Sequence, residues 1–245
     1  MYGYGYKYVN GLVVGSGGAP TPPPFVNTKS ILFDGTDDNV DCGVISAFQS
    51  TANFSVSFWL KVPNLAASNF IFSTFTSGSN TIYSYLTTSG EIVFNINNTY
   101  QRLSGLTNPL AAGQWYNITL VYDGGIPSME IYIDGVIGTG APVTPPIQTG
   151  TNTANLKIGL VPFGNYFEGN IDEFAIYDYP LTAAEALAIG GTVPTDLSLL
   201  SSPPTNWWRN GDGVTAFPTI PDAIGTNDGT AFNEPESTMI VPDVP

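Results

Sequence analysis

Histidine is absent from the 245-residue chain, and cysteine occurs once, as Cys42. The missing imidazole excludes Ser-His-Asp and Cys-His catalysis within this chain, and it removes the commonest general base and metal ligand of proteins. A single cysteine excludes an intrachain disulfide and a zinc site built from cysteines. Because Cys42 falls in an expected strand, we interpret it as a small buried hydrophobic residue rather than a reactive thiol.

Basic residues are scarce as well. The 6 Lys and Arg stand against 20 Asp and Glu, which gives a net charge of −14. Because phosphate binding needs clustered basic side chains, this balance argues against nucleic acid and against an anionic membrane surface as partners. No apolar run approaches transmembrane length, and residues 1–10 lack the basic and apolar segments of a secretory signal. We therefore expect no membrane insertion, and synthesis in a cytoplasm without a signal peptide.

Alternating apolar and polar residues dominate the middle of the chain. In residues 54–62 every second side chain, from Phe54 to Val62, is apolar and shares one face, a period typical of a β-strand. Asp134-Gly135 predicts a tight hairpin turn, because Gly accepts a positive φ. Short strands joined by polar turns predict an all-β fold, a two-sheet antiparallel jelly-roll sandwich. Further strands are expected at residues 69–75, 81–86, 91–96, 115–122, 129–133, 156–160 and 171–177.

An N-terminal arm, residues 1–28, precedes the strands. It is rich in Tyr, Gly and Pro, and it predicts a flexible segment without a core of its own. The alternating Tyr2, Tyr4, Tyr6 and Tyr8 would suit a strand added to the edge of a neighbouring sheet, which makes them candidate assembly contacts. The alternative is a disordered leader.

The sandwich itself is assigned to residues 29–190. Near its end, residues 182–189 predict a helix, because Thr182 and Glu185 have the spacing of a capping box and two glycines follow.

A C-terminal tail, residues 191–245, has too few apolar runs for a separate core, and we expect it to pack on the sandwich or on a neighbouring subunit. Trp207, Trp208 and Arg209 are its candidate assembly contacts. Adjacent tryptophans cannot both enter the same face of one strand, so one would fill the sandwich while the other anchors at an interface.

Four segments together resemble one known family. Over residues 29–190, their order and spacing are similar to those of the laminin-G-like, concanavalin A-like family. The resemblance implies a β-sandwich that binds sugars or proteins rather than one that breaks bonds, and it leaves the ligand open. The segments are Ser30-Ile-Leu-Phe-Asp-Gly35, Trp115-Tyr-Asn-Ile-Thr-Leu-Val-Tyr-Asp123, Ile131-Tyr-Ile-Asp-Gly135 and Ile171-Asp-Glu-Phe-Ala-Ile-Tyr177.

The arm, the Pro-rich linker and the tail are similar to those of laminin-G-like structural proteins of marine bacteriophages. This similarity implies a non-enzymatic virion protein on the surface of a phage particle, a capsid decoration or a fibre-like component. Its partners would be other virion proteins, further copies of itself and a cell-surface glycan. A free carbohydrate-binding lectin, with calcium as a cofactor, is the alternative, and a glycoside hydrolase is a third hypothesis.

Oxygen ligands suited to calcium gather in one loop. Asp37, Asp38 and Asn39 form the densest group, and Asp123 and Asp134 at strand ends could add ligands. Ca²⁺ takes six to eight oxygen ligands, and members of the resembled family often bind one ion at the rim of the sandwich. The alternative is turn chemistry, in which Asp and Asn bond their own backbone.

Aromatic residues at exposed strand positions could stack on sugar rings. The alternative for each of them is a place in the core, since aromatics at strand spacing are mostly core residues. The candidates are Trp59, Tyr83, Tyr85, Tyr100 and Tyr132.

Glu168, Asp172 and Glu173 come nearest to a pair of glycosidase carboxylates. As neighbours in a strand, Asp172 and Glu173 are expected to point to opposite faces. We therefore predict no catalytic residues, and a structural role in which a carboxylate fixes a neighbouring strand or loop.

Overall fold

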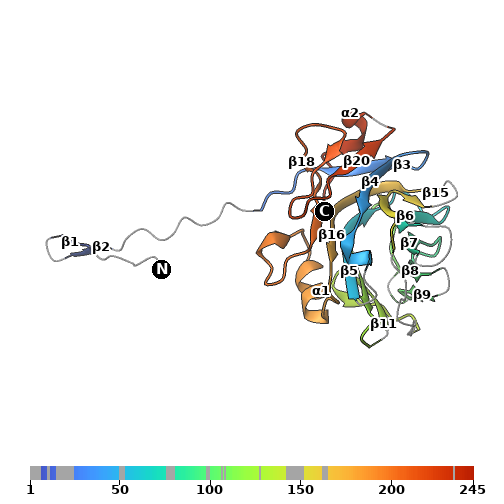
Figure 1. Ribbon diagram of the computed structural model, residues 1–245, viewed down its shortest axis with the longest axis horizontal. Helices are drawn as coiled ribbons and strands as arrows, with labels where there is room; N and C mark the ends of the chain where they lie inside the picture. Colours follow the sequence, from blue (N-terminus) through green and yellow to red (C-terminus); the bar gives the residue numbers. More distant parts are fainter. Residues whose placement is uncertain are drawn as a thin grey trace.

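The computed structural model of the protein describes residues 7–9, 12–14, 25–49, 53–75, 81–97, 100–105, 107, 109–126, 128–141, 152–161, 165–233 and 235–245. Near the N-terminus, β1 (Lys7–Val9) pairs antiparallel with β2 (Leu12–Val14), and Tyr8 lies opposite Val13. Tyr2, Tyr4 and Tyr6 lie outside the described residues. The remaining strands form two large sheets and one small hairpin (Figure 1).

One sheet, which we call the covered sheet, has the helix α1 (Ala183–Ile189) packed on its outer face. Strand β17 pairs with β16 beyond the point where β3 ends. The strands, in spatial order, are β12 (Val136–Ile137), β11 (Ser128–Ile133), β10 (Tyr116–Asp123), β5 (Asn53–Lys61), β16 (Glu168–Tyr177), β3 (Ser30–Asp34) and β21 (Ile240–Val241), with β17 (Asn206–Trp208) on β16.

The other sheet, which we call the open sheet, carries no helix on its outer face among the described residues. Its strands, in spatial order, are β19 (Thr219–Ile220), β20 (Gly229–Phe232), β4 (Asn39–Val44), β13 (Asn155–Ile158), β6 (Asn69–Thr74), β7 (Ile82–Leu86), β8 (Ile92–Ile96) and β9 (Tyr100–Leu103). The remaining elements are β14 (Leu160–Val161), β15 (Asn165–Tyr166), β18 (Asn210–Gly213), α2 (Glu236–Met239) and the 3-10 turns η1 (Ser46–Gln49) and η2 (Leu197–Leu199).

The main core lies between the two sheets. In β5 the alternate residues Phe54, Val56, Phe58 and Leu60 are at most 2% exposed and face this core, as their period predicted. Full burial of one such side chain stabilises the fold by roughly 1.5–3 kcal/mol. All pairings between the strands are antiparallel, which confirms the predicted two-sheet antiparallel sandwich. Cys42 is buried in the same core.

A second, smaller core lies between the covered sheet and α1. Outward-facing residues of β10, β11 and β16 pack there against Ala186 and Ile189 of the helix. The helix begins as predicted: the Thr182 side chain accepts from the backbone N–H of Glu185, whose carboxylate accepts from the backbone N–H of Thr182. These two bonds satisfy backbone donors that the first helical turn leaves open.

The predicted hairpin turn at Asp134-Gly135 is present. Both residues have positive φ, 49° and 74°. A side chain at Gly135 would bring its Cβ within 2.7 Å of the Leu187 Cα, so only glycine allows the turn to press against α1.

The tail contributes strands to both sheets. Strand β17 pairs with β16, β21 with β3, and β20 with β4. Trp208 of β17 is fully buried in the main core and packs on Phe174 at 6.2 Å between ring centroids. Strands of two to four residues that complete an existing sheet need no apolar period of their own, which explains why the sequence showed few strands there.

No helix among the described residues is both long enough and apolar enough to cross a lipid bilayer.

Candidate functional site

The outer face of the open sheet carries one continuous row of side chains, which we call the polar row. Strand pairing places its members opposite one another on successive strands, and directly opposed side chains lie on the same face of a sheet. Neighbouring strands are about 4.8 Å apart, so the row runs across the sheet. From β20 to β9 its members are Thr230, Asp41, Lys157, Ser73, Tyr83, Asn95 and Gln101.

An aromatic tract made of Phe70, Tyr83 and Tyr85 lies along one end of the polar row. The ring centroids of Phe70 and Tyr85 are 5.0 Å apart, and Tyr83 stacks on Tyr85 at 6.2 Å with 21° between the ring planes. All three side chains are partly exposed, and Tyr83 and Tyr85 face outward because the alternate residues Ile82 and Leu86 of β7 face the core. Burial, with a smaller contribution from Tyr85, raises the pKa of Tyr83, so its hydroxyl stays protonated at neutral pH.

Amide groups flank the aromatic tract. Gln101 is exposed and its Nε2 lies 3.5 Å from the Tyr85 hydroxyl. Asn95, directly opposite Tyr83, is 3% exposed, and its buried Oδ1 accepts no hydrogen bond from the described residues. Buried polar atoms are almost always hydrogen-bonded, so an unpaired amide oxygen beside exposed rings is an unusual feature.

The other end of the polar row is charged. Lys157 Nζ lies 2.6 Å from Asp41 Oδ2, and Asn155 Nδ2 donates to both Asp41 oxygens. Burial by itself would raise the pKa of Asp41, but hydrogen bonds from Lys157, the Gly43 backbone and Asn155 lower it below its ordinary value. This end therefore presents a paired carboxylate and ammonium.

Among the predicted sugar-stacking residues, the structure brings only Tyr83 and Tyr85 together on an accessible face. Tyr132 is 3% exposed, its hydroxyl donates to Glu130 Oε2 at 2.6 Å, and it packs in the second core, so its prediction as a glycan platform is wrong. Trp59 is 4% exposed on the covered sheet and is likewise no open platform. Tyr100 lies opposite Ile96 at the edge of the open sheet, and its side chain is outside the described part of the structure.

Two of the three carboxylates considered for hydrolysis, Asp172 and Glu173, lie buried under the outer layer of the covered sheet. A β-bulge between Asp172 and Ala175, with Glu173 at φ 49°, interrupts the alternation of β16. As a result, Ile171 and Phe174 both face the main core, while Asp172 and Glu173 both face outward. The prediction that these two acids point to opposite faces is therefore wrong.

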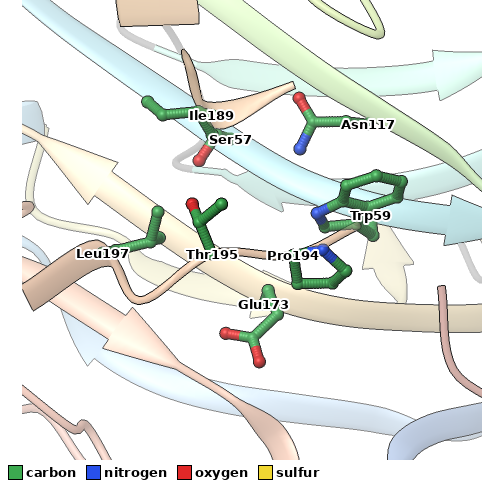
Figure 2. A pocket seen from close by; sticks show the side chains of 8 residues that line it. All are labelled: Ser57, Trp59, Asn117, Glu173, Ile189, Pro194, Thr195 and Leu197. Atoms are coloured by element: carbon green, nitrogen blue, oxygen red, sulfur yellow. The ribbon is translucent and has the colours of Figure 1, made fainter. Parts of the chain in front are cut away.

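Glu173 joins β16 to the tail. Its Oε2 accepts from Trp207 Nε1 at 2.6 Å, and its Oε1 lies 3.3 Å from Arg209 Nε. The cavity beside it, which Ser57, Trp59 and Thr195 help to line, has a volume of about 10 Å³ (Figure 2). Such a space has room for about one water molecule, so a sugar ring cannot reach this carboxylate in the structure.

Asp172 is fully buried beside Glu173. Its two oxygens accept from Asn27 Nδ2 and from the Glu173 backbone N–H, both at 2.8 Å. Burial raises the pKa of Asp172, and the charge of Glu173 adds to the effect. Burial also raises the pKa of Glu173, against the opposing influence of Arg209 and Trp207. Glu168, the third acid considered, is exposed and lies opposite Asp34.

The predicted assembly contacts of the tail pack against other residues of the same chain. Trp208 fills the main core, and Trp207, 4% exposed, stacks on Phe25 at 6.0 Å between centroids. Arg209 lies 4.5 Å from the Phe25 ring centroid, and its Nη2 donates to the Val26 carbonyl. Trp207 therefore holds the start of the sandwich in place, and the prediction that one tryptophan stays free for an interface is wrong.

Three acids form the strongest cluster of potential metal ligands among the described residues. Carboxylate oxygens of Asp34, Asp37 and Asp38 lie within 4.8 Å of one another, and Asn39 Nδ2 donates to the Asp37 carbonyl. Asp34 Oδ1 also accepts from the Thr36 backbone N–H, which is turn chemistry. The cluster supplies carboxylates that would suit Ca²⁺. Asp34 and Asp37 are exposed, and exposed acidic groups are common without an ion, whereas Asp38 is 1% exposed and accepts from the Asp34 backbone N–H.

Asp123 and Asp134 do not join that cluster. Asp123 ends β10 and accepts from the Gly125 backbone N–H, whereas Asp134 bonds Asn117 near the start of β10. Six residues of strand separate these positions, roughly 20 Å. A single site that contains all five predicted ligands is therefore excluded.

Sequence reasoning missed Phe70, Asn95 and Gln101 as partners of the two tyrosines. Phe70 lies just before a register shift in the pairing of β6 with β7, and the two amides belong to other strands. These side chains meet only because of the register in which the strands pair. Alternation within one strand predicts the face on which a side chain lies, but it does not predict which residue of the next strand lies beside it.

Residues 34–186, more than half of the chain, match the concanavalin A-like lectin/glucanases superfamily. The chain belongs to this superfamily. No curated protein sequence matches it.

Solved structures share the fold. A putative carbohydrate binding protein from Bacteroides ovatus superposes with a TM-score of 0.64 at 18% identity, over 86% of this chain and 59% of that one. The sialidase CBM40 of Ruminococcus gnavus, bound to α2,3-sialyllactose, gives 0.52 at 15% identity, over 66% and 96%. Domain 4 of an extracellular arabinanase from Geobacillus stearothermophilus, in complex with arabinotriose, gives 0.50 at 21% identity, over 66% and 76%. The chain thus spans 59% of the Bacteroides ovatus protein, and it shares the β-sandwich fold of these structures.

Proposed function

We propose that the chain is a non-catalytic carbohydrate-binding protein that holds a neutral glycan on the outer face of the open sheet. The observation that carries the proposal is the aromatic tract beside the polar row. Stacked, partly exposed rings offer apolar surface to the apolar face of a sugar, and the exposed Gln101 amide and the tyrosine hydroxyls offer hydrogen bonds to its rim.

Two further features support the proposal. The buried acids of the covered sheet each have internal partners, and the cavity beside Glu173 is too small for a sugar, so neither acid is placed for hydrolysis. The net charge of −14 repels acidic glycans at long range, which favours a neutral ligand. Calcium dependence, through the cluster around Asp37, stays a prediction from the sequence.

The test is a double substitution, Tyr83→Ala/Tyr85→Ala, in a glycan array followed by calorimetry with the best neutral oligosaccharide. Loss of two stacking surfaces should weaken binding by about ten- to a hundredfold. The matched control is Phe232→Ala, which removes an exposed aromatic from the same face, four strands and about 19 Å away from Tyr83. Unchanged affinity in the double variant, or equal loss in the control, would refute the aromatic tract as the binding surface.

A role in a phage particle is the finer form of this proposal. The structure offers it one support: Phe25, Asn27 and Thr28 are fixed by Trp207, Asp172 and Asp212, so the preceding arm leaves from an anchored point. Deletion of residues 1–24 should then leave glycan binding intact and abolish incorporation into particles. Incorporation of the shortened chain at the normal level would count against the arm as the attachment segment.

A further inference from the structure

We propose that the protein has a second carbohydrate site, a cleft on the covered sheet between Trp115, Asp134 and the end of α1 that takes one neutral pyranose unit. This site lies on the opposite sheet from the aromatic tract and does not depend on it. Together the two sites would make a single domain bivalent for glycans.

The cleft is large enough for a ligand. It has a volume of about 410 Å³ and is open to solvent. Small-molecule pockets in proteins span about 300–1,000 Å³. Trp59 lies at its buried base, Leu187 at its rim is 60% exposed, and Gly190, Gly191 and Thr192 line the wall beyond α1.

Trp115 gives the cleft a fixed aromatic wall. It is the partly exposed tryptophan of the four, since Trp59 and Trp207 are 4% exposed and Trp208 is fully buried. Its Nε1 donates to Asp243 Oδ1 at 3.1 Å, and Lys61, which forms an ion pair with Asp243, lies 5.4 Å from the ring centroid. A ring held by these contacts loses little freedom when a ligand stacks on it.

Asp134 gives the cleft a hydrogen-bond acceptor. Its Oδ1 accepts from the Asn117 backbone N–H at 2.8 Å, which fixes the carboxylate, and a carboxylate can accept further bonds. Thr192 adds a hydroxyl. The lining residues include one acid and no base, so they favour a ligand that offers hydroxyl donors and disfavour an anionic one. A neutral pyranose combines these hydroxyls with an apolar face for Trp115.

The distribution of tryptophan makes the cleft testable separately from the aromatic tract. The tract contains Phe and Tyr only, so a sugar bound there leaves the indole groups untouched. In ¹H–¹⁵N spectra, methyl β-glucopyranoside, methyl β-galactopyranoside and methyl α-mannopyranoside are titrated in turn into the full chain. We expect at least one sugar to shift the indole resonances of Trp115 and Trp59 and to leave those of Trp207 and Trp208 in place.

Gly191→Leu supplies the blocking variant. Gly191 lines the cleft, a Cβ there would meet nothing closer than the Val193 carbonyl oxygen at 3.9 Å, and its φ is outside the left-handed region, so the backbone accepts a leucine at this wall of the cleft. The matched control is Val193→Leu, because Val193 is 58% exposed and does not line the cleft. The indole shifts should vanish in Gly191→Leu and persist in Val193→Leu.

Two results would overturn the cleft: no indole shift with any of the three sugars in the folded protein, or shifts that persist in Gly191→Leu. Either result can occur while Tyr83→Ala/Tyr85→Ala still abolishes glycan-array binding. In that case the aromatic tract is supported as a glycan site and the cleft is refuted as one. Indole shifts that survive the double tyrosine substitution, with array binding also unchanged, would support the cleft and refute the aromatic tract.

Discussion

The two sheets share one core but differ on their outer faces. The covered sheet lies under α1, the tail and residues 25–28, and its outward polar groups, Asp172 and Glu173 among them, are buried in internal bonds. The open sheet leaves Tyr83, Tyr85 and Gln101 partly or fully exposed. Buried polar groups that are tied to one another stabilise a structure, whereas exposed groups remain available to a ligand. The difference supports the proposal that one outer face stabilises the fold and the other binds a ligand, with the proposed Trp115 cleft as the exception.

Removal of the tryptophan that ties the tail into the core should have the largest effect. Trp208→Ala would leave a cavity in the main core beside Phe174 and cost about 3–5 kcal/mol of the free energy of unfolding. Urea denaturation followed by circular dichroism measures it. Leu199→Ala, at a position 73% exposed, is the control and should change stability by less than about 0.5 kcal/mol. Equal free energies of unfolding for the two variants would mean that the contact of the tail with the main core does not contribute to stability.

Loss of the Glu173 carboxylate, which joins β16 to the tail, should have the second largest effect on stability. Glu173→Ala leaves Trp207 Nε1 without its acceptor and Arg209 without its buried partner, which should cost about 2–4 kcal/mol. Glu173→Gln keeps an acceptor and should lose roughly half as much. If the glutamine variant is the less stable of the two, the hydrogen bond to Trp207 is not what holds the tail.

The paired acids predict an unusual pH dependence. Their pKa values are raised in the folded state, so these two carboxyls bind protons more tightly in the folded protein than in the unfolded chain above about pH 4, where free carboxyls ionise. Stability should therefore be highest near the acidic end of this range and fall, by on the order of 1–2 kcal/mol, as the pH rises through the raised values. Thermal melts between acidic and alkaline pH measure the slope.

Asp172→Asn tests the origin of that slope. The amide cannot ionise, and the Asn27 side chain, whose Oδ1 has no partner among the described residues, can turn to accept from it. We expect a flatter profile with the largest gain at alkaline pH. A profile as steep as that of the unsubstituted protein would place the titrating groups elsewhere.

The smallest effect should come from the ion pair on the open sheet. Lys157→Ala removes the partner of Asp41, but both side chains are partly exposed, so the cost should be below about 1 kcal/mol and should shrink further in high salt. Arg209→Ala, which breaks the pair with buried Glu173, is the matched variant on the covered sheet and should cost clearly more. Comparable losses of stability in the two variants would contradict the conclusion that the covered face contributes more to stability than the open face.

Local patterns were enough to predict several elements of the fold. The alternation in residues 54–62 gives β5 and its inward face, the pair Asp134-Gly135 gives the hairpin turn, and Thr182 with Glu185 gives the helix start. Each of these depends on residues within a few positions of one another. The same reasoning failed at Glu173, because a bulge is an extra residue in a pairing and is defined only relative to the partner strand.

The candidate sites depend on register and on what covers each face. Tyr83 and Tyr85 could be placed on one face of a strand from the sequence, but Tyr132 showed the same alternation and is buried under α1. The sequence predicted the longer strands of the sandwich, the inward face of β5, the turn and the helix cap, because these follow from backbone geometry over a few residues. The tertiary structure alone decided which outer face stays open, which acids are buried and which aromatics meet, because packing joins residues that are distant in the chain.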